Sequence, residues 1–453
     1  MTSVNELVLV NGLILADPDK GEVLPHGVTV ISRGELAQVN SPDDGKLFAT
    51  PVIDCSGCLI MPGLINLHNH AAMSLLRGLA DDLPLDEWLN DYVFPSERRH
   101  VNPQSVYLGT ALSAMEMALN GISTCADGYF FMEHAAQAFI DVGIRAVVAQ
   151  GILDVPVPDV PEAGAWRDRV DEFLFSCPRD PLITPALFCH SPYLCSPDTL
   201  MQSAKIAQEH KSLLFCHVAE TALEVEQVIG RYGRRPVEHL ASLELLGRGF
   251  VAVHCIHISD GEKDLLAKSG TGIVHCPESN MKLASGASPV WDLLSRGITI
   301  GLGTDGPASN NNLDLFEEMR TASLAAKLVT RDPQALAARQ VLKMATTDAA
   351  RILGMEDRIG SLESGKQADI AIVDLDRPHL TPLYDPISHL VYAARGSDVR
   401  DVIVHGRIVV RNGRLTRADE SIIKEQARAL AEEIRREVSI QRSCASSCGC
   451  VTA

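Results

Sequence analysis

Apolar and polar positions follow two different rhythms between residues 59 and 365. Short apolar runs without helical spacing are separated by longer segments in which apolar residues recur every three or four positions. The short runs predict eight strands, at residues 59–67, 123–126, 144–150, 182–189, 213–216, 250–253, 272–274 and 298–303. Helices are predicted between them, for instance over residues 106–119, 200–210, 237–246 and 261–268. This alternation favours a (β/α)8 TIM barrel of the α/β class, in which active sites lie at the C-terminal ends of the strands.

Both ends of the chain differ from this pattern, because strand-like runs there are separated by turn residues and not by helices. Such runs occupy residues 6–15, 27–32, 36–39 and 51–54 near the start, and 368–374, 399–405 and 407–411 near the end. We expect one small β-sandwich built from both termini, although two unrelated hairpins would have the same pattern. The predicted organisation is a first sandwich part at 1–58, the barrel at 59–365, a second sandwich part at 366–418, a helix at 419–442 and a flexible tail at 443–453.

The negative net charge makes some classes of binding partner improbable for this protein. Lys and Arg number 40 against 58 Asp and Glu, a net charge of −18, which argues against duplex nucleic acid or an anionic membrane as a partner. The first residues lack the basic segment and long apolar core of a signal peptide, and no apolar run reaches the ~18–20 residues that span a bilayer. We therefore expect a cytoplasmic protein.

The 12 cysteines do not predict a disulfide framework. Most are scattered, many within apolar runs, where cysteine packs as a small hydrophobic residue, and a large chain without a secretion signal is expected to keep free thiols. The last three, Cys444, Cys448 and Cys450, crowd the small-residue tail. Three thiols without a nearby fourth ligand make a poor structural zinc site, so we expect no catalytic role for the tail.

Histidine or aspartate follows most of the predicted strands. The first run ends in His68 and His70, which are two residues apart and therefore point to the same side of a strand. Such a pair alone is more often a surface or core feature than a metal site. Later runs, however, end in His190, His217, His254, His275 and Asp305. Because the ends of parallel barrel strands meet at one face, the pattern predicts a shared metal site there.

The ligand types suit one divalent ion per chain. Three imidazoles and one carboxylate favour zinc, with iron(II) or manganese(II) as alternatives, and leave a position open for water. The expected ligands are His68, His70, His217 and Asp305. A divalent ion brings the pKa of water close to neutrality, and hydrolysis then needs a base for the water proton and an acid for the substrate. We assign the base to Asp305 with His254, and the acid to Glu220. No lysine closes the run before His190 or His217, which disfavours two carbamate-bridged metals.

Eight short stretches carry a specific resemblance to a known family. They are residues 62–70 (PGLINLHNH), 76–78 (LRG), 87–89 (EWL), 190–193 (HSPY), 217–221 (HVAET), 275–280 (HCPESN), 303–310 (GTDGPASN) and 363–369 (ESGKQAD). On these motifs the chain resembles the amidohydrolase superfamily, in the branch of nucleoside and base deaminases and triazine hydrolases. Within that branch it is similar to the deaminases of 5′-methylthioadenosine and S-adenosylhomocysteine. The resemblance covers about residues 5 to 435 and leaves out the cysteine tail.

The resemblance implies a distorted barrel, a mononuclear metal site and hydrolytic deamination at C6 of an adenine nucleoside, which gives the inosine analogue and ammonia. The family's ligands match His68, His70, His217 and Asp305. Glu220 matches the residue that handles the purine ring nitrogen, and Asp305 also faces the substrate. His190 matches a substrate contact, and Glu97 matches the carboxylate that holds the ribose hydroxyls. Trp88 is expected to form one wall of the substrate pocket. Without the resemblance, Trp88 would be taken as a core tryptophan and Glu97 as a surface glutamate. The expected partners are a small nucleoside and further copies of the chain in a homo-oligomer.

One expected substrate contact departs from the family pattern. Relatives that accept S-adenosylhomocysteine have an arginine after the third strand, where this chain has Gln150. Arg167 could serve the substrate's carboxylate, but it follows a proline-rich loop, residues 155–161, that has no clear match in the family. A neutral glutamine favours the uncharged methylthio substrate, because burying a carboxylate without a partner costs free energy.

Two other classes of function stay open on the sequence. The first is another enzyme of the same branch: a guanine, cytosine or pterin deaminase, or a hydrolase that removes chloride from triazines. The second is a metal-free barrel that serves only as a scaffold, which is disfavoured because every expected ligand is present. Ammonia release over a panel of substrates separates these enzymes.

Overall fold

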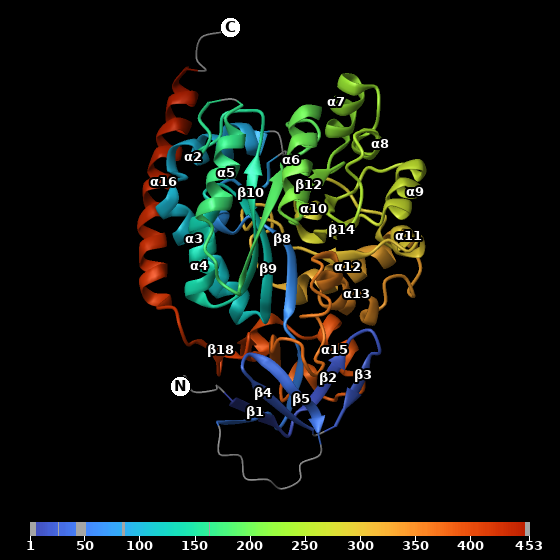
Figure 1. The fold of residues 1–453 in the computed structure, drawn as a ribbon. Coiled ribbons are helices and arrows are strands. Elements are labelled where there is room, and N and C mark those ends of the chain that lie inside the picture. Colours follow the sequence, from blue (N-terminus) through green and yellow to red (C-terminus); the bar gives the residue numbers. More distant parts are fainter. Residues whose placement is uncertain (1–5, 26, 42–50, 84–86, 163, 449–453) are drawn as a thin grey trace.

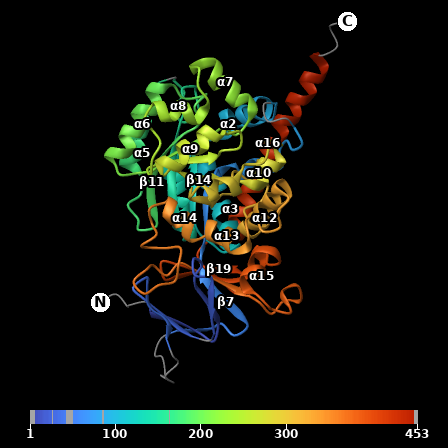
Figure 2. The same cartoon turned by 90° about the vertical axis from the view of Figure 1, so that its right-hand side faces the viewer.

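The chain folds into a helix-covered barrel and a smaller β-domain below it (Figure 1). This computed structural model describes residues 6–25, 27–41, 51–83, 87–162 and 164–448. The earliest and latest strands, blue and orange-red, lie together in the lower domain, and the middle of the chain forms the barrel. A quarter turn shows the same division, with α7 (Ala222–Tyr232) and α8 (Pro236–Ser242) at the end of the barrel far from the β-domain (Figure 2).

Eight parallel strands form the barrel in sequence order. They are β8 (Leu64–Asn69), β9 (Ile122–Tyr129), β10 (Arg145–Ile152), β11 (Ile183–Cys189), β12 (Leu214–Val218), β13 (Phe250–His254), β14 (Gly272–His275) and β15 (Ile300–Leu302). After β15 the chain returns to the first strand, where the Asp305 amide donates to the His68 carbonyl oxygen over 3.0 Å. The predicted (β/α)8 fold is confirmed, and the strand ends that carry histidines lie at one face.

Helices cover the outside of the barrel. Besides α7 and α8 they are η1 (Ala71–Leu76), η2 (Trp88–Val93), α2 (Phe94–His100), α3 (Pro103–Leu119), α4 (Met132–Val142), α5 (Trp166–Ser176), α6 (Pro197–Glu209), α9 (Asp260–Ser269), α10 (Pro277–Lys282), α11 (Val290–Ser295), α12 (Leu315–Thr330), α13 (Ala338–Met344) and α14 (Thr347–Ile352). The four helices predicted by periodicity correspond to α3, α6, α8 and α9. Asn102, Ser196 and Ser259 cap α3, α6 and α9, because their side chains accept backbone N–H groups of the first turn.

Apolar side chains fill the barrel below the strand ends. Ile65, Phe215 and Val253 belong to one buried cluster in the barrel interior. Ile352 of α14 joins this cluster and packs against Gly272 at the start of β14, so α14 closes the end where the strands begin. The polar chemistry is therefore confined to the opposite face, where the strands end.

The lower β-domain uses both ends of the chain, as predicted. One sheet contains β1 (Glu6–Val10), β4 (Val28–Ser32), β5 (Glu35–Ser41) and β6 (Val52–Asp54). The other contains β2 (Leu13–Asp17), β3 (Glu22–Leu24), β7 (Cys58–Pro62), β16 (Ile370–Asp374), β17 (Val399–Val404), β18 (Arg407–Arg411) and β19 (Arg414–Leu415). Early and late strands meet where β7 pairs with β16, and Leu9, Ile60 and Ile372 are buried together in the domain's core. Short helices η3 (Pro378–Leu380), α15 (Pro386–Tyr392) and η4 (Gly396–Asp398) connect β16 to β17.

Two predicted strands are each divided into two. The run at 59–67 forms β7 in the β-domain and β8 in the barrel, so the barrel begins at Leu64 and not at residue 59. The break is at Gly63, where a Cβ atom would collide with the side chain of Ser123. The run at 6–15 forms β1 and β2 in different sheets, because Asn11 takes a left-handed backbone conformation (φ 66°) between them. Periodicity alone identified these apolar runs but not the bends within them.

The last helix, α16 (Glu420–Cys448), extends beyond the predicted end at residue 442. It runs along the side of the barrel beside α3 (Figure 1), and its Ala427 and Ile434 are buried. Cys444 and Cys448 therefore lie in a helix and not in a tail, and Cys450 falls outside the described residues. In the described ranges no helix is long and apolar enough to cross a membrane. The other nine cysteines are buried free thiols, as expected.

Candidate active site

Four predicted metal ligands converge at the C-terminal face of the barrel. His68 and His70 come from the end of β8, His217 from β12, and Asp305 from the loop after β15. Asp305 Oδ1 lies 3.3 Å from His68 Nε2 and 3.5 Å from His70 Nε2. His217 Nε2 lies 3.2 Å from His68 Nε2. Potential ligand atoms of His70, His217 and Asp305 thus gather around His68, at the centre of the strand ends.

These separations fit a metal ion. Ligands arranged tetrahedrally at about 2.0–2.1 Å from zinc are about 3.3 Å from one another, close to the three separations of 3.2, 3.3 and 3.5 Å given above. In two overlapping groups, the potential ligand atoms all lie within 4.8 Å of one another. One group is His68, His70 and Asp305, and the other is His68, His217 and His254. The described residues therefore contain a donor set of the composition and size that a divalent cation requires.

His70 is oriented by the strand next to it. Its Nδ1 lies 2.5 Å from the carbonyl oxygen of Gly128 on β9, a contact in which Nδ1 donates and Nε2 is left free toward Asp305. The Asp127 carboxylate accepts the Ala71 amide over 2.6 Å and so fixes the chain directly after His70. Hydrogen bonds of this kind set the tautomer and direction of a ligating imidazole.

Asp305 has its two carboxylate oxygens in different environments. Oδ1 faces the histidines and accepts the Gly306 amide over 2.7 Å, while Oδ2 accepts the Ser279 hydroxyl over 2.7 Å. The backbone of Asp305 is left-handed (φ 61°). Burial would raise the pKa of this carboxyl, but the neighbouring imidazoles of His68, His70 and His254 hold it well below the usual range. Asp305 therefore stays ionised and can bind a cation.

His254 and Glu220 form a second, mixed pair beside the ligands. Glu220 Oε2 lies 3.7 Å from His254 Nε2, and Asn280 Oδ1 accepts from His254 Nδ1 over 2.9 Å. Burial raises the pKa of the Glu220 carboxyl, with His254 opposing that rise. Burial would lower the pKa of His254, but the Glu220 and Asp305 carboxylates and the Asn280 hydrogen bond raise it above its usual value. The two side chains can therefore share a proton.

The turn that carries Glu220 is fixed by another glutamate. Ala219 has a left-handed backbone (φ 51°), which is unfavourable for a residue with a Cβ atom. Glu224, in the first turn of α7, accepts the Ala219 and Glu220 amides over 2.8 Å each. Thr221 caps the same helix through a hydrogen bond from the Glu224 amide. Glu224 therefore holds the strained turn that aims Glu220 at the site.

An aromatic ring separates the histidines from the barrel core. The Phe188 ring lies 5.6 Å from the ring of His68, at an angle of 21° between the planes, and 4.8 Å from that of His217. His190, directly after β11, has its ring 5.0 Å from His217, in agreement with its predicted place beside the metal ligands. Burial lowers the pKa of His190 to about 3, so its imidazole is neutral.

His275 does not join the cluster, although it ends a strand as the other histidines do. Val274 faces the barrel interior, so the next side chain faces the surrounding helices. There His275 lines a cavity together with Pro277, Trp291 and Val329. The prediction that His275 shares one site with the other strand-end histidines is therefore wrong.

Glu97 is buried, contrary to what an isolated glutamate on a helix would suggest. It lies on α2, is 7% exposed, and its Oε1 accepts the Tyr129 hydroxyl over 2.6 Å. Burial raises the pKa of Glu97 to about 7, against the opposing effect of the Tyr129 hydrogen bond. Trp88, at the start of η2, is buried in the large hydrophobic cluster, so its predicted contact with substrate stays a prediction.

Gln150 does not face the barrel interior, where the candidate metal ligands lie, so its position does not support the predicted substrate contact. Its neighbour Ala149 points into the barrel, which turns Gln150 toward the helices. There Gln150 Nε2 donates to Asp159 Oδ2 over 2.8 Å, and Arg169 Nε donates to the same oxygen over 3.0 Å. Arg167 is exposed and donates to Gln202 on α6. The loop after β10 is thereby closed by its own polar contacts.

Four residues near the site were given no role by the sequence: Tyr129, Glu224, Ser279 and Asn280. Asn280 and Ser279 belong to the His-Cys-Pro-Glu-Ser-Asn stretch that carried part of the resemblance, which was the available signal. Glu224 stands four residues after Glu220, a helical spacing after a Thr cap. The sequence contained no signal for Tyr129, because its strand was expected to end at residue 126, whereas β9 continues to Tyr129.

Comparison with known proteins identifies amidohydrolases, and among them deaminases, as relatives of this chain. The model of the Amidohydrolase family matches residues 59–409. The 5-methylthioadenosine/S-adenosylhomocysteine deaminase of Syntrophobacter fumaroxidans is 46% identical over 433 residues, which cover 95% of this chain and 98% of that protein. The 5'-deoxyadenosine deaminase of Methanothermobacter thermautotrophicus is 43% identical over 435 residues, covering 95% and 99%.

A solved structure is similar to the whole chain. It is an adenosine deaminase from Xanthomonas campestris with bound zinc, which is 36% identical to this chain. The match has a TM-score of 0.92 and covers 95% of this chain and 98% of the other. The similarity therefore extends over both the barrel and the β-domain.

Proposed function

The chain belongs to the amidohydrolase family, and on that premise we propose that it deaminates adenine nucleosides whose 5′ substituent carries no charge. The family match and the deaminase relatives make the protein a hydrolytic deaminase. Those relatives are named for 5-methylthioadenosine, S-adenosylhomocysteine and 5'-deoxyadenosine. The observation that carries the proposal is the Glu220–His254 pair, 3.7 Å apart and directly beside the candidate metal ligands.

The proposed metal is zinc, one ion per chain. The ligands would be His68, His70, His217 and Asp305, and the three separations of 3.2–3.5 Å that link them in sequence suit tetrahedral coordination. When bound, the ion supplies Lewis acidity that makes water nucleophilic at neutral pH. His70 presents Nε2 to this site because its Nδ1 is engaged by the Gly128 carbonyl oxygen. A related adenosine deaminase structure contains zinc, which supports the choice of metal.

The chain's own carboxyls would divide the proton transfers between them. Asp305 is ionised, so it accepts the proton of the attacking water through its carboxylate. Burial favours the protonated form of Glu220, and that carboxyl would donate its proton to the purine ring nitrogen beside C6. His254, held by Asn280, stabilises the negative charge on Glu220 after that transfer. Asp305 would then pass the water proton to the C6 amino group, which leaves as ammonia, and the hydroxyl proton at C6 would return to Glu220, so that the inosine analogue remains.

The ribose side of the substrate would be held by buried polar groups. Glu97 supplies a carboxylate for the ribose hydroxyls, and neutral His190 supplies a hydrogen bond close to His217. Trp88 lies on η2, the segment that directly precedes the Glu97 helix α2, and would pack against the nucleoside. A purine nucleoside offers the aromatic face and the adjacent hydroxyls that such a set recognises.

The preference for an uncharged 5′ substituent is proposed because the nearby arginines already bind other side chains of the protein. S-adenosylhomocysteine carries an α-carboxylate, and burying it without a partner costs free energy. Arg169 donates to Asp159 and also pairs with Glu133, while Arg167 is exposed and donates to Gln202. Gln150 is neutral and faces the helices. We therefore favour 5′-methylthioadenosine, 5′-deoxyadenosine and adenosine over S-adenosylhomocysteine.

A substrate panel tests this function. Ammonia release is measured for zinc-loaded protein with adenosine, 5′-methylthioadenosine, 5′-deoxyadenosine, S-adenosylhomocysteine and guanine. The expected order places the three uncharged nucleosides about 10- to 150-fold above S-adenosylhomocysteine in kcat/KM, the size of a lost hydrogen bond to a charged group. Turnover of guanine alone would instead assign the protein to base deamination, and a preference for S-adenosylhomocysteine would remove the uncharged class.

A further inference from the structure

Tyr129 and Glu97 form a hydrogen bond between two elements that are far apart in the sequence. Tyr129 ends the barrel strand β9, and Glu97 lies in the outer helix α2. The Tyr129 hydroxyl donates to Glu97 Oε1 over 2.6 Å, and each residue is only 7% exposed. A buried bond of this length to a carboxylate is geometrically demanding and fixes both side chains.

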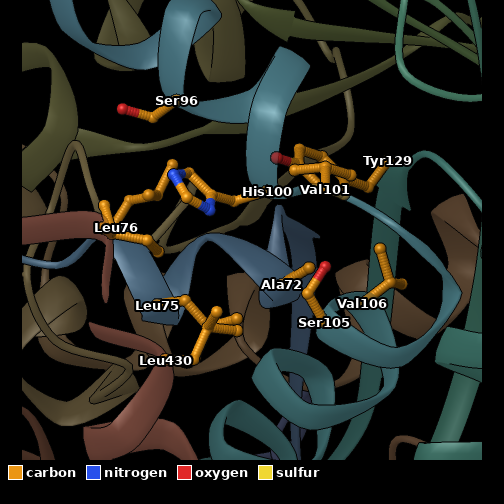
Figure 3. Close-up of a pocket in the computed structure, with 11 residues that line it drawn as sticks. Ala72, Leu75, Leu76, Ser96, His100, Val101, Ser105, Val106, Tyr129 and Leu430 are labelled. Carbon is orange, nitrogen blue, oxygen red and sulfur yellow. The ribbon is translucent and has the colours of Figure 1, made fainter. Parts of the chain in front are cut away.

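The pair lies next to the candidate catalytic cluster. The Tyr129 ring centroid is 6.4 Å from that of His70, one of the expected metal ligands. On its other side, Tyr129 borders a small cavity whose walls come from η1, α2, α3 and α16, with Ala72, His100, Val106 and Leu430 among the lining residues (Figure 3). Tyr129 is therefore held between the active-site face and the packed outer helices.

The two oxygens of Glu97 are not equivalent. Oε1 accepts the Tyr129 hydroxyl, whereas Oε2 accepts no hydrogen bond from the part of the chain that the structure describes. Oε2 is not among the fully enclosed polar atoms that lack a partner, so a ligand can reach it. The adjacent hydroxyls of a ribose supply donors for this oxygen.

We propose that Tyr129 is a positioning residue for ribose recognition, which holds Glu97 through Oε1 so that Oε2 meets the ribose hydroxyls. This inference rests on the proposed nucleoside function and adds a residue to it. Tyr129 acts through Glu97 and does not itself touch the substrate. Its removal leaves the carboxylate free to rotate, so that the ribose contact weakens while the chemistry at C6 is unaffected.

The central test is Tyr129→Phe, which removes only the hydroxyl. We expect KM for adenosine and 5′-methylthioadenosine to rise about tenfold, the effect of one lost hydrogen bond, with kcat changed less than about twofold. KM for 2′,3′-dideoxyadenosine, which lacks both ribose hydroxyls, should be the same in the wild type and the variant. Tyr107→Phe is the matched control, because the Tyr107 hydroxyl also donates to a carboxylate, that of Asp141, over 2.8 Å on the protein surface.

The double variant Glu97→Gln/Tyr129→Phe distinguishes positioning from a general structural effect. If Tyr129 works through Glu97, the double variant should have the KM of Glu97→Gln alone, because no carboxylate is left to position. Equal KM increases for ribonucleosides and the dideoxynucleoside would overturn the inference, as would additive effects in the double variant. Unfolding transitions of all variants, followed by circular dichroism, confirm that folded proteins are compared.

Failure of the inference and failure of the proposed function give different results. If Glu97→Gln raises KM for ribonucleosides and Tyr129→Phe does not, the ribose contact stands and the role of Tyr129 is refuted. If Glu97→Gln leaves every KM unchanged, Glu97 does not bind ribose, and the inference falls with that assignment.

Discussion

His254 Nε2 lies 3.7 Å from Glu220 Oε2, at the ends of two adjacent barrel strands. Val251 and Val253 point into the barrel, so simple alternation would direct the next side chain outward. The left-handed backbone at His254 and Cys255 (φ 72° and 48°) breaks the alternation, and the imidazole ring comes within 5.3 Å of the His217 ring. Backbone strain at this strand end therefore places His254 beside Glu220 and the candidate metal ligands.

The first prediction concerns that acid. Glu220→Gln should retain the metal, because Glu220 is not among the candidate ligands, but lose at least ~100-fold in kcat, the usual scale of general acid–base catalysis. Steady-state kinetics with 5′-methylthioadenosine, combined with metal analysis of the same sample, checks both points. Near-normal turnover would remove Glu220 from the mechanism.

The second prediction concerns the metal. Elemental analysis should find about one divalent ion per chain, and His217→Ala should lose it because an imidazole ligand is gone. Dialysis against a chelator should lower the Tm of the wild type and hardly change that of the metal-free variant, since a ligand that binds the folded state stabilises it. His134→Ala is the control, because His134 lies on α4 and its side chain is 43% exposed. Two ions per chain, or full retention in a His68→Ala/His217→Ala variant, would contradict a mononuclear site.

The third prediction concerns Glu224, which accepts the amides of the turn that carries Glu220. Glu224→Gln replaces one acceptor oxygen with a donor, so one buried N–H group loses its partner, at a cost of about 1–3 kcal/mol. We expect kcat to fall about tenfold with little change in KM, because the turn no longer aims the acid. Glu226→Gln, in the same helix but exposed, is the matched control. A loss of thermal stability without any loss of kcat would show that Glu224 has a structural role alone.

The fourth prediction concerns pH. Burial raises the pKa of Glu97 to about 7, so this carboxyl takes up a proton as the pH falls through neutrality. A protonated carboxyl is a poorer acceptor for ribose hydroxyls, so KM for adenosine should rise below about pH 7, at most tenfold per pH unit. Glu97→Gln should abolish this dependence. A KM for adenosine that stays constant from pH 8 to pH 6 would exclude an ionised Glu97 from ribose binding.

Periodicity identified the barrel strands and the strand ends that carry most of the candidate site. Strand-end positions identified His68, His70, His217 and Asp305, because the ends of parallel strands in a barrel meet at one face whatever the loops do. His254 and His275 mark the limit of this reasoning. Both end strands after an inward-facing valine, yet a left-handed backbone turns only His254 into the site, and a sequence does not reveal that conformation.

Gln150 illustrates a second limit. Its place in the family pattern indicated a substrate contact, but the direction of its side chain depends on the strand register and on Asp159, nine residues later, which accepts its amide. Glu97 is the opposite case, since a position that looks solvent-exposed in the sequence is buried by contact with Tyr129. Such long-range pairings are formed by tertiary packing and have no signal in local composition.

The most direct test of deamination by this protein follows the oxygen atom from water to product. Zinc-loaded protein is incubated with 5′-methylthioadenosine in water enriched in heavy oxygen, and the product is analysed by mass spectrometry while ammonia is measured. We predict one labelled oxygen at C6 of the inosine analogue for each ammonia released, with both signals lost in Glu220→Gln. Unchanged 5′-methylthioadenosine in the presence of bound zinc, together with ammonia release from guanine or chloride release from a triazine, would contradict an adenine-nucleoside deaminase.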